Sequence, residues 1–96
     1  MKTICWNVRG LGNPRAMGRL RRLIRERRPD LLFLSETRLK GARVDRLKWK
    51  LGFNNGFGVH AVGLSGGLHL LWHEGIEVSI QSYSKGHIDA SVVDER

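Results

Sequence analysis

The feature that most constrains the fold is an uninterrupted apolar run at residues 31–34, which follows a Pro-Asp pair. Apolar residues in succession, without polar alternates, are typical of a strand that is covered on both faces. The whole chain has 96 residues, which is enough for one small domain with a thin core. We therefore expect a single layered domain in which this strand is central.

A strand and a helix are predicted before this run. Residues 2–8 alternate between apolar and other side chains, which favours a strand. Asn13 is a candidate N-cap, with Pro14 at the first helical position. An apolar stripe at helical spacing then continues to Arg28, before Pro29 stops the helix. Because the strand–helix–strand unit is short, we expect its two strands to be parallel.

The second half of the chain predicts one helix and several strands. Residues 43–51 have the spacing of a short helix. Residues 52–67 are rich in Gly and Asn, with short apolar pieces around Phe57, Val59 and Val62, and no strand is assigned there. Residues 68–72 predict a strand that turns at a Glu-Gly pair into a second strand, residues 76–80, as a hairpin. Residues 88–93 predict a last strand. This order indicates an α/β or α+β fold with two helices and a mixed β-sheet.

Composition excludes several classes of protein. The longest uncharged apolar run is far shorter than the ~20 residues of a membrane-spanning helix, so no membrane partner is expected. Met1 and Lys2 are not followed by the apolar core of a secretory signal. The single cysteine, Cys5, excludes an internal disulfide and a cysteine-rich zinc module, and we expect it to be a small buried side chain. An intracellular protein is the simplest interpretation.

Charge is divided unevenly along the chain. Residues 1–50 carry 15 basic and 4 acidic side chains, a net charge of +11, whereas residues 51–96 carry 2 basic and 5 acidic side chains, a net charge of −3. A basic region of this density suits a polyanionic partner such as nucleic acid. The alternative is a solvated helix face that happens to be rich in arginine.

Two polar side chains close the first two predicted strands. Glu36 follows the apolar run, and Asn7 lies at the end of the first strand. Parallel neighbours would bring both to the carboxyl edge of the sheet, where open α/β sheets bind their ligands. There Glu36 could bind a hard cation such as Mg²⁺, and Asn7 could orient a metal-bound water or a carboxylate. In the structural alternatives, Glu36 caps a turn or pairs with Arg38, and Asn7 hydrogen-bonds to the turn at residues 10–13.

The aromatic, glycine and histidine residues give weaker indications. Trp6, Trp49 and Trp72 could stack on bases, but their positions in predicted strands and a helix favour the core. The glycines after the first strand lack the spacing of a phosphate-binding loop, and the histidines lack the spacing of a zinc site. Neither dinucleotide binding nor zinc binding is therefore expected.

Three motifs together resemble the start of the endonuclease/exonuclease/phosphatase family. They are Cys5-Trp6-Asn7-Val8-Arg9-Gly10-Leu11-Gly12, then Pro29-Asp30-Leu31-Leu32-Phe33-Leu34-Ser35-Glu36-Thr37, and then Ser65-Gly66-Gly67-Leu68 with Leu71-Trp72. All 96 residues fit the family in order and spacing. The motif sequences are most similar to those of the endonuclease domains of plant LINE-type (non-LTR) retrotransposons. They are similar, more distantly, to those of abasic-site endonucleases and pancreatic deoxyribonuclease.

The resemblance implies a partial two-sheet sandwich of the deoxyribonuclease type and hydrolysis of DNA phosphodiester bonds with Mg²⁺ or Mn²⁺. In the family, an asparagine after the first strand helps to build the catalytic centre and a glutamate that ends the second strand is the principal metal ligand. Here these residues are Asn7 and Glu36. Arg9 stands where the abasic-site branch has an acid, which changes the expected substrate rather than the reaction. With DNA as the partner, Arg9, Arg19 and Arg22 are the candidate nucleic-acid contacts, and a nuclear location is expected.

The family's later motifs, Gly-Asp-Phe-Asn and Ser-Asp-His, are not among these residues. We therefore expect residues 1–96 to be the N-terminal part of an endonuclease domain whose C-terminal half belongs to a longer product. Those motifs supply groups for proton transfer and water alignment, so the chain alone is expected to be a very poor enzyme. The alternative is a catalytically dead remnant that binds nucleic acid through its basic helix, and a third hypothesis is a relic that does neither.

Overall fold

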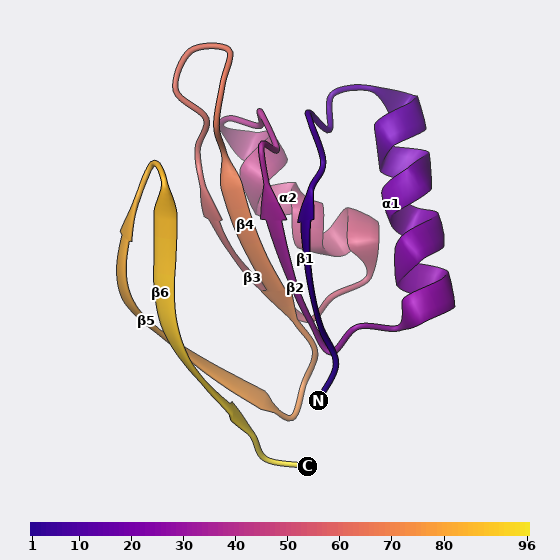
Figure 1. The fold of residues 1–96 in the computed structure, drawn as a ribbon, viewed down its shortest axis with the longest axis vertical. Helices are drawn as coiled ribbons and strands as arrows, with labels where there is room; N and C mark the ends of the chain where they lie inside the picture. Colours follow the sequence, from indigo (N-terminus) through magenta and orange to yellow (C-terminus); the bar gives the residue numbers. More distant parts are fainter.

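Strands and helices alternate up to residue 51, and only strands follow (Figure 1). A computed structural model describes all 96 residues. The elements are β1 (Thr3–Asn7), α1 (Pro14–Arg27), β2 (Leu31–Ser35), α2 (Ala42–Leu51), β3 (Asn55–Val59), β4 (Leu68–Trp72), β5 (Ile76–Ser84) and β6 (His87–Asp94). The fold is α+β with two helices, as the sequence predicted.

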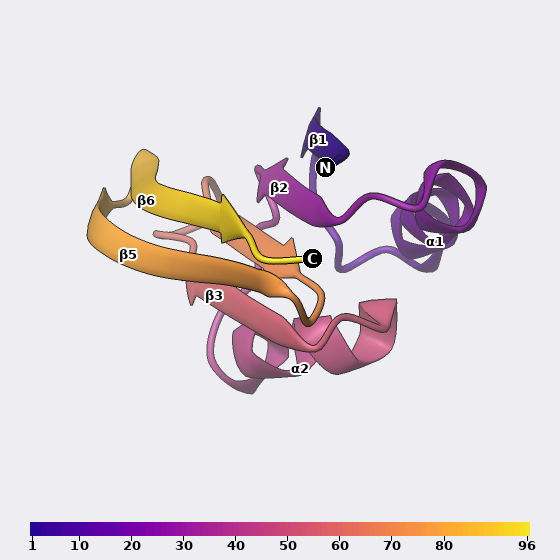
Figure 2. The same cartoon turned by 90° about the horizontal axis from the view of Figure 1, so that it is seen from below.

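Four strands form one mixed sheet in the order β1-β2-β4-β3. As predicted, β1 and β2 are parallel, with Asn7 level with Ser35, whereas β4 is antiparallel to both β2 and β3. The helices α1 and α2 lie on one face of this sheet, and the two-stranded β5–β6 sheet lies on the other (Figure 2). The two sheets give the partial sandwich that the resemblance implied.

The predicted hairpin of residues 68–72 with residues 76–80 is wrong. The chain does turn at residues 73–75, but β5 then leaves the four-stranded sheet and pairs with β6. The reason is that β2 and β3 already occupy both edges of β4, which leaves no free hydrogen-bonding edge for β5. β5 is also longer than predicted and extends to Ser84.

No strand was predicted within residues 52–67, so the prediction missed strand β3. Its sequence is Asn-Gly-Phe-Gly-Val, and glycines usually indicate turns. Here they allow close packing, because a Cβ on Gly58 would overlap Val44 of α2 and would lie 2.6 Å from Nδ1 of His69. Glycine therefore lets α2 approach the sheet directly, as glycine does in strands where another element comes close.

The ends of α1 follow the predicted signals. Oδ1 of Asn13 accepts the backbone N–H of Arg15 at 2.7 Å, and Pro14 is the first helical residue. Arg28 ends the helix in a left-handed conformation with φ of 47°, and Pro29 follows. Neither helix of the chain is long and apolar enough to cross a membrane.

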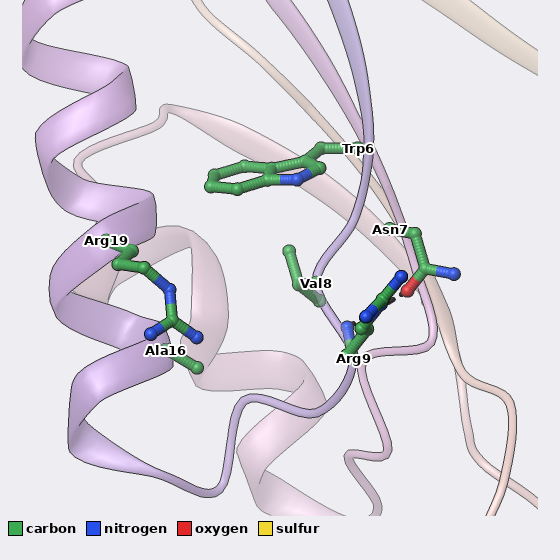
Figure 3. Close-up of a pocket in the computed structure, with 6 residues that line it drawn as sticks. All are labelled: Trp6, Asn7, Val8, Arg9, Ala16 and Arg19. Carbon is green, nitrogen blue, oxygen red and sulfur yellow. Dashed lines mark hydrogen bonds between the residues drawn. The ribbon is translucent and has the colours of Figure 1, made fainter.

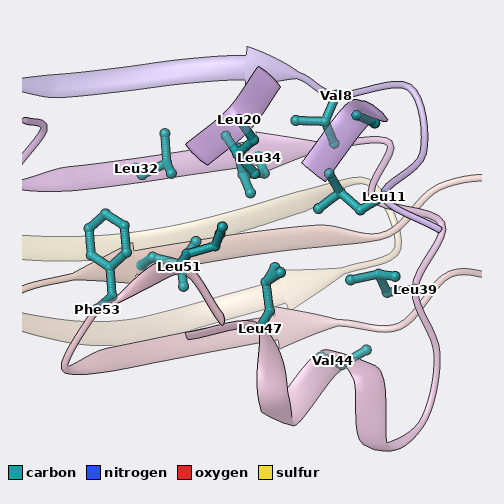
Figure 4. Close-up of a cluster of buried hydrophobic side chains, with 12 residues drawn as sticks. Val8, Leu11, Leu20, Leu32, Leu34, Leu39, Val44, Leu47, Leu51 and Phe53 are labelled. Atoms are coloured by element: carbon teal, nitrogen blue, oxygen red, sulfur yellow. The ribbon is translucent and has the colours of Figure 1, made fainter. Parts of the chain in front are cut away.

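The main core lies between the four-stranded sheet and the two helices (Figure 4). Its twelve buried side chains are Val8, Leu11, Ala16, Leu20, Leu32, Leu34, Leu39, Val44, Leu47, Leu51, Phe53 and Leu71. A smaller cluster lies between the sheet and the hairpin, where only Leu31, Leu70 and Ile76 are buried. We call these two surfaces of the sheet the helix face and the hairpin face.

Two side chains expected in the core are exposed instead. Cys5 lies on β1, an edge strand, on the side that the hairpin leaves uncovered. Trp49 of α2 is 69% exposed, whereas Trp6 and Trp72 are half-buried. Both errors have one cause: sequence spacing shows which residues share a face, but it does not show whether another element covers that face.

Candidate functional site

The carboxyl ends of β1 and β2 form a continuous edge. Backbone hydrogen bonds continue beyond the strands, with Val8 N–H donating to Ser35 O at 3.0 Å and Gly10 N–H donating to Glu36 O at 2.6 Å. Because Asn7 pairs with Ser35 and Glu36 follows directly, the structure brings Asn7 and Glu36 to the same edge. The edge is held by backbone bonds, which leaves the side chains on it available for other contacts.

Three residues at this edge have backbone conformations that L-residues rarely adopt. Arg9, Glu36 and Arg38 have φ values of 50°, 55° and 56°. The left-handed region is costly for residues other than glycine, and residues held there are concentrated at functional sites. The other non-glycine residue of this kind, Arg28, ends α1. Backbone strain is therefore concentrated at the carboxyl edge of the sheet.

The Glu36 carboxylate is only partly engaged. Its Oε2 accepts the Gly66 N–H at 3.4 Å and lies 3.9 Å from Nε of Arg38. The Arg38 pair of the structural alternative is thus present, but it is weak because both side chains are exposed to water. Oε1 has no hydrogen-bond partner, and the side chain is 39% exposed. One carboxylate oxygen is therefore free to bind a ligand.

Two glycines hold the backbone around Glu36. The Thr37 N–H donates to Gly67 O at 3.1 Å, and the Arg38 N–H donates to Gly66 O at 2.9 Å. Gly67 has φ of +90°, and a Cβ there would overlap Oγ1 of the buried Thr37. Only glycine fits this position without a shift. The glycine pair thus shapes the loop that presents Glu36.

Asn7 is exposed, and its amide is oriented by the local backbone. Oδ1 accepts the Arg9 N–H at 3.0 Å, which closes a tight turn and leaves the amide –NH₂ free to donate (Figure 3). The structural alternative placed this hydrogen bond in the turn at residues 10–13, whereas the observed donor is Arg9, just before that turn. An uncharged donor at this edge can bind a phosphate oxygen without changing the local charge.

A cavity of about 300 Å³ opens beside Glu36, and we call it the Glu36 cavity. Its lining consists of Glu36, His60, Val62, Ser65, Gly66, Gly67, Lys85 and Gly86. Nδ1 of His60 accepts the Gly41 N–H at 3.0 Å, so the neutral ring carries its proton on Nε2. Lys85 lies in the turn between β5 and β6. A cation and a hydrogen-bond donor therefore share the cavity with the carboxylate.

Sequence reasoning missed His60 and Lys85. Lys85 reaches the Glu36 cavity only because the hairpin folds across the sheet, and nothing in its local sequence indicates that position. His60 lies in the connection after β3, a strand that the sequence did not predict. The one usable signal was the Ser-Gly-Gly motif at residues 65–67, which does line the cavity.

The predicted arginine contacts lie elsewhere. Arg9 and Arg19 line a second cavity, of about 400 Å³, between β1 and α1, together with Asn7 (Figure 3). We call this the β1–α1 cavity; Glu36 does not line it. Arg22 is exposed on α1 and lines neither cavity. Asn7 therefore shares a cavity with two of the predicted arginines, whereas Glu36, although it lies at the same sheet edge, lines the other cavity and Arg22 lines neither.

The motifs and the fold agree with one known family. The sequence profile of the endonuclease/exonuclease/phosphatase family matches residues 4–96. The chain belongs to this family. A search of curated proteins finds no match. Family membership places the chain among hydrolases of the nuclease and phosphatase type.

The endonuclease/exonuclease/phosphatase family depends in general on divalent metal ions, and the edge fits such an ion. No group of three or more His, Cys, Asp or Glu side chains gathers in the structure. Mg²⁺, however, commonly takes one or two protein carboxylates and completes its shell with water and substrate phosphates. Glu36, with one free carboxylate oxygen and partial exposure, would be the protein ligand of such an ion.

Proposed function

We propose that the chain is part of a DNA endonuclease of the plant LINE-type retrotransposon branch, which hydrolyses phosphodiester bonds with Mg²⁺ or Mn²⁺. The motif sequences around Asn7 and Glu36 support the retrotransposon branch, and Arg9 in place of an acid argues against the abasic-site branch. The observation that carries the proposal is the free Glu36 carboxylate oxygen on the strained edge that also carries the Asn7 amide. A DNA substrate would place the protein in the nucleus.

In this proposal Glu36 is the metal ligand. A bound divalent cation would polarise the phosphoryl oxygen and offset charge on the leaving group. Asn7 donates from its free –NH₂ to a phosphate oxygen. Lys85 and His60 line the same cavity as Glu36 and supply a positive charge and a hydrogen-bond donor for the phosphate.

Residues 1–96 are proposed to be the N-terminal part of the endonuclease domain. The second part of a longer product would supply the groups for water alignment and proton transfer. A side chain positioned for proton transfer commonly accelerates a reaction by ~10²–10⁴-fold. The 96 residues alone should therefore nick DNA slowly.

Nicking of supercoiled plasmid DNA tests the proposal. The purified chain is incubated with plasmid in Mg²⁺, beside Glu36→Gln and a chelator control. The matched control variant is Glu26→Gln, which removes the same charge from an exposed position on α1. We expect slow nicking that needs both the metal and Glu36 and that is unchanged in Glu26→Gln.

Two results would overturn this proposal, provided that circular dichroism shows each protein to be folded. Nicking that persists in Glu36→Gln or in the chelator would assign the activity to another site or to a contaminant. An absence of nicking by the unsubstituted chain would remove catalysis from these residues and favour the second candidate function below.

The second candidate is nonspecific nucleic-acid binding by α1. The helix carries six arginines and one glutamate, and none of these arginines forms an ion pair. Unpaired cations can neutralise phosphates of the nucleic-acid backbone, so the affinity should fall steeply as the salt concentration rises. The slope of log affinity against log salt concentration is proportional to the number of phosphates neutralised. Titration of a labelled duplex at several salt concentrations measures this slope. An affinity that hardly changes between low and physiological salt would reject this candidate.

A further inference from the structure

The β1–α1 cavity has the dimensions of a ligand site. Its volume of about 400 Å³ falls within the roughly 300–1,000 Å³ that small-ligand sites occupy. Its lining residues are Trp6, Asn7, Val8, Arg9, Ala16 and Arg19 (Figure 3). Asn7 belongs to the carboxyl edge, so a ligand in this cavity would lie next to the proposed metal site without occupying it.

The cavity is positively charged. Arg9 and Arg19 line it, no acidic side chain does, and neither arginine forms an ion pair. The Arg9 backbone is held at φ of 50° with its N–H bound to Asn7 Oδ1, which fixes the direction in which its side chain leaves the turn. Guanidinium groups match the geometry of phosphate oxygens. One guanidinium from a strand end and one from a helix therefore suit a phosphate group.

An aromatic ring forms another wall of the cavity. Trp6 is half-buried and packs against the core of the helix face. Its ring extends from β1 toward α1, above the guanidinium of Arg19 (Figure 3). Nucleic-acid bases of every kind stack on such rings because each base has a π face. A phosphate joined to a planar base is the chemistry that would use both the arginines and Trp6.

We propose that the β1–α1 cavity binds one nucleotide of a nucleic-acid strand, with the base against Trp6 and the phosphate between Arg9 and Arg19. This inference rests on the proposed function, because the strand would continue past Asn7 to the phosphodiester at Glu36. The cavity would fix the register of the strand relative to the bond that is cut. It acts by positioning and needs no metal ion.

Metal-free binding to a single-tryptophan protein tests the inference. Trp49→Phe with Trp72→Phe leaves Trp6 as the only indole, so its fluorescence reports on the cavity. The ligands are a deoxynucleoside 5′-monophosphate, a short single-stranded oligonucleotide and inorganic phosphate, all in EDTA. We expect saturable quenching by the first two and at least ~10-fold weaker binding of phosphate, which cannot stack. Equal affinity for phosphate and nucleotide would overturn the proposal.

Two arginine variants separate the cavity from general surface charge. Arg19→Ala removes a cavity cation, whereas Arg46→Ala removes the same charge from an exposed position on α2 outside the cavity. Arg19→Ala should weaken nucleotide binding about tenfold. For the oligonucleotide, the slope of the logarithm of the binding constant against the logarithm of the salt concentration should become shallower by ~0.7 for each phosphate that is no longer neutralised. Arg46→Ala should change neither quantity. Equal effects of the two variants would also overturn the proposal.

Failure of this inference is distinguishable from failure of the proposed function. Nucleotide binding in EDTA involves neither the metal nor Glu36, which does not line the cavity. Binding without nicking would reject catalysis and keep the nucleotide site, whereas nicking without nucleotide binding would reject the nucleotide site alone. Isothermal titration of the unsubstituted chain gives the same ligand comparison if the tryptophan variant does not fold.

Discussion

The two faces of the four-stranded sheet are built differently. The helix face contributes to a core of twelve buried side chains, whereas the cluster on the hairpin face has three, surrounded by half-buried neighbours. Both faces are apolar, so the difference is one of coverage: two helices close one side, and a single two-stranded sheet covers part of the other (Figure 2). Since buried apolar area is the main favourable contribution to folding, the helix face should supply most of the stability.

This difference extends to the candidate site. Val8, next to Asn7, and Leu39 belong to the core of the helix face, so the carboxyl edge is anchored on the well-packed side. Lys85 reaches the Glu36 cavity from the hairpin, on the less buried side. The carboxylate thus lies on the firmly packed part of the molecule, and its cationic neighbour lies on the more adaptable part.

Adjacent leucines of β4 give the largest test of this comparison. Leu71 is 0% exposed on the helix face, and Leu70 is 5% exposed on the hairpin face. Leu71→Ala should lower the free energy of unfolding by about 3–5 kcal/mol and Leu70→Ala by about 1–2 kcal/mol, because a loosely covered site closes more easily around a smaller side chain. Urea denaturation followed by circular dichroism measures both. Equal losses would show that the hairpin packs as tightly as the helices.

The helix face also buries a titratable group. His69 is 3% exposed and lies against Gly56 and Gly58 of β3, near α2. Burial lowers its pKa from 6.5 to about 4, although Asp45 opposes part of this shift. Above pH 6.5 the ring is neutral in the folded and the unfolded chain. Between pH 6.5 and about 4 only the unfolded chain binds the proton, so stability falls as the pH falls through this window.

By the lower end of that window, protonation of His69 in the unfolded chain should have lowered the free energy of unfolding by ~3 kcal/mol. Urea denaturation at a series of pH values measures it. His69→Leu should remove this pH dependence, whereas His87→Gln, at an exposed position of the hairpin, should retain it. If the free energy of unfolding of the unsubstituted chain stays constant between pH 6.5 and about 4, water reaches the His69 ring. The core on the helix face would then be more hydrated than its packing indicates.

The glycine pair beside Glu36 offers a matched test at the edge between the two faces. Gly66 and Gly67 have φ of +80° and +90°, but a Cβ meets nothing within 4 Å at Gly66 and overlaps Thr37 Oγ1 at Gly67. Gly66→Ala should lower the free energy of unfolding by about 1–2 kcal/mol, from backbone strain alone. Gly67→Ala should lower it by roughly 1–3 kcal/mol more, because of the overlap with Thr37. Gly67→Ala should also reduce metal-dependent nicking further, since it displaces the residue after Glu36. Equal losses would show that this loop shifts as a unit.

The helix face could be predicted from sequence better than the hairpin face. The Asn13 cap of α1, the strands β2 and β4 and the parallel pair follow from local signals, namely apolar spacing, a cap and a proline. The pairing of β5 could not be predicted, because it depends on which edges of β4 are already occupied. Strand β3 was missed since its glycines are explained by Val44 and His69, which are distant in sequence.

The candidate site shows the same limit. Asn7 and Glu36 could be placed on one edge because a short strand–helix–strand unit implies parallel pairing. Their chemical roles stay predictions. His60 and Lys85 could not be found, since each lies in a connection whose position is set by long-range packing rather than by local sequence.

An ion-pair cluster ties the base of the hairpin to the four-stranded sheet. Arg96, which follows β6, donates to Asp30 Oδ1 at 2.8 Å, just before β2, and to both carboxylate oxygens of Asp94 at 3.0 Å. These hydrogen bonds lower the pKa of Asp30 and that of Asp94 from 3.8 to about 2. Because the folded-state pKa values are lowered, the contribution of the cluster to stability is present above pH 3.8 and is lost as the pH falls toward about 2.

Arg96→Gln should give the smallest effect of these changes, because the groups are exposed and surface ion pairs are weak. The pKa of Asp30 and that of Asp94 should rise toward 3.8, as followed by NMR of the carboxyl groups. The Glu95 amide, which donates across the hairpin base at 2.8 Å, should exchange its hydrogen faster. Lys85→Gln removes the same charge at the hairpin tip and should change neither readout. If Arg96→Gln leaves exchange at Glu95 unchanged, apolar contacts alone hold the hairpin, and the two faces differ only in packing.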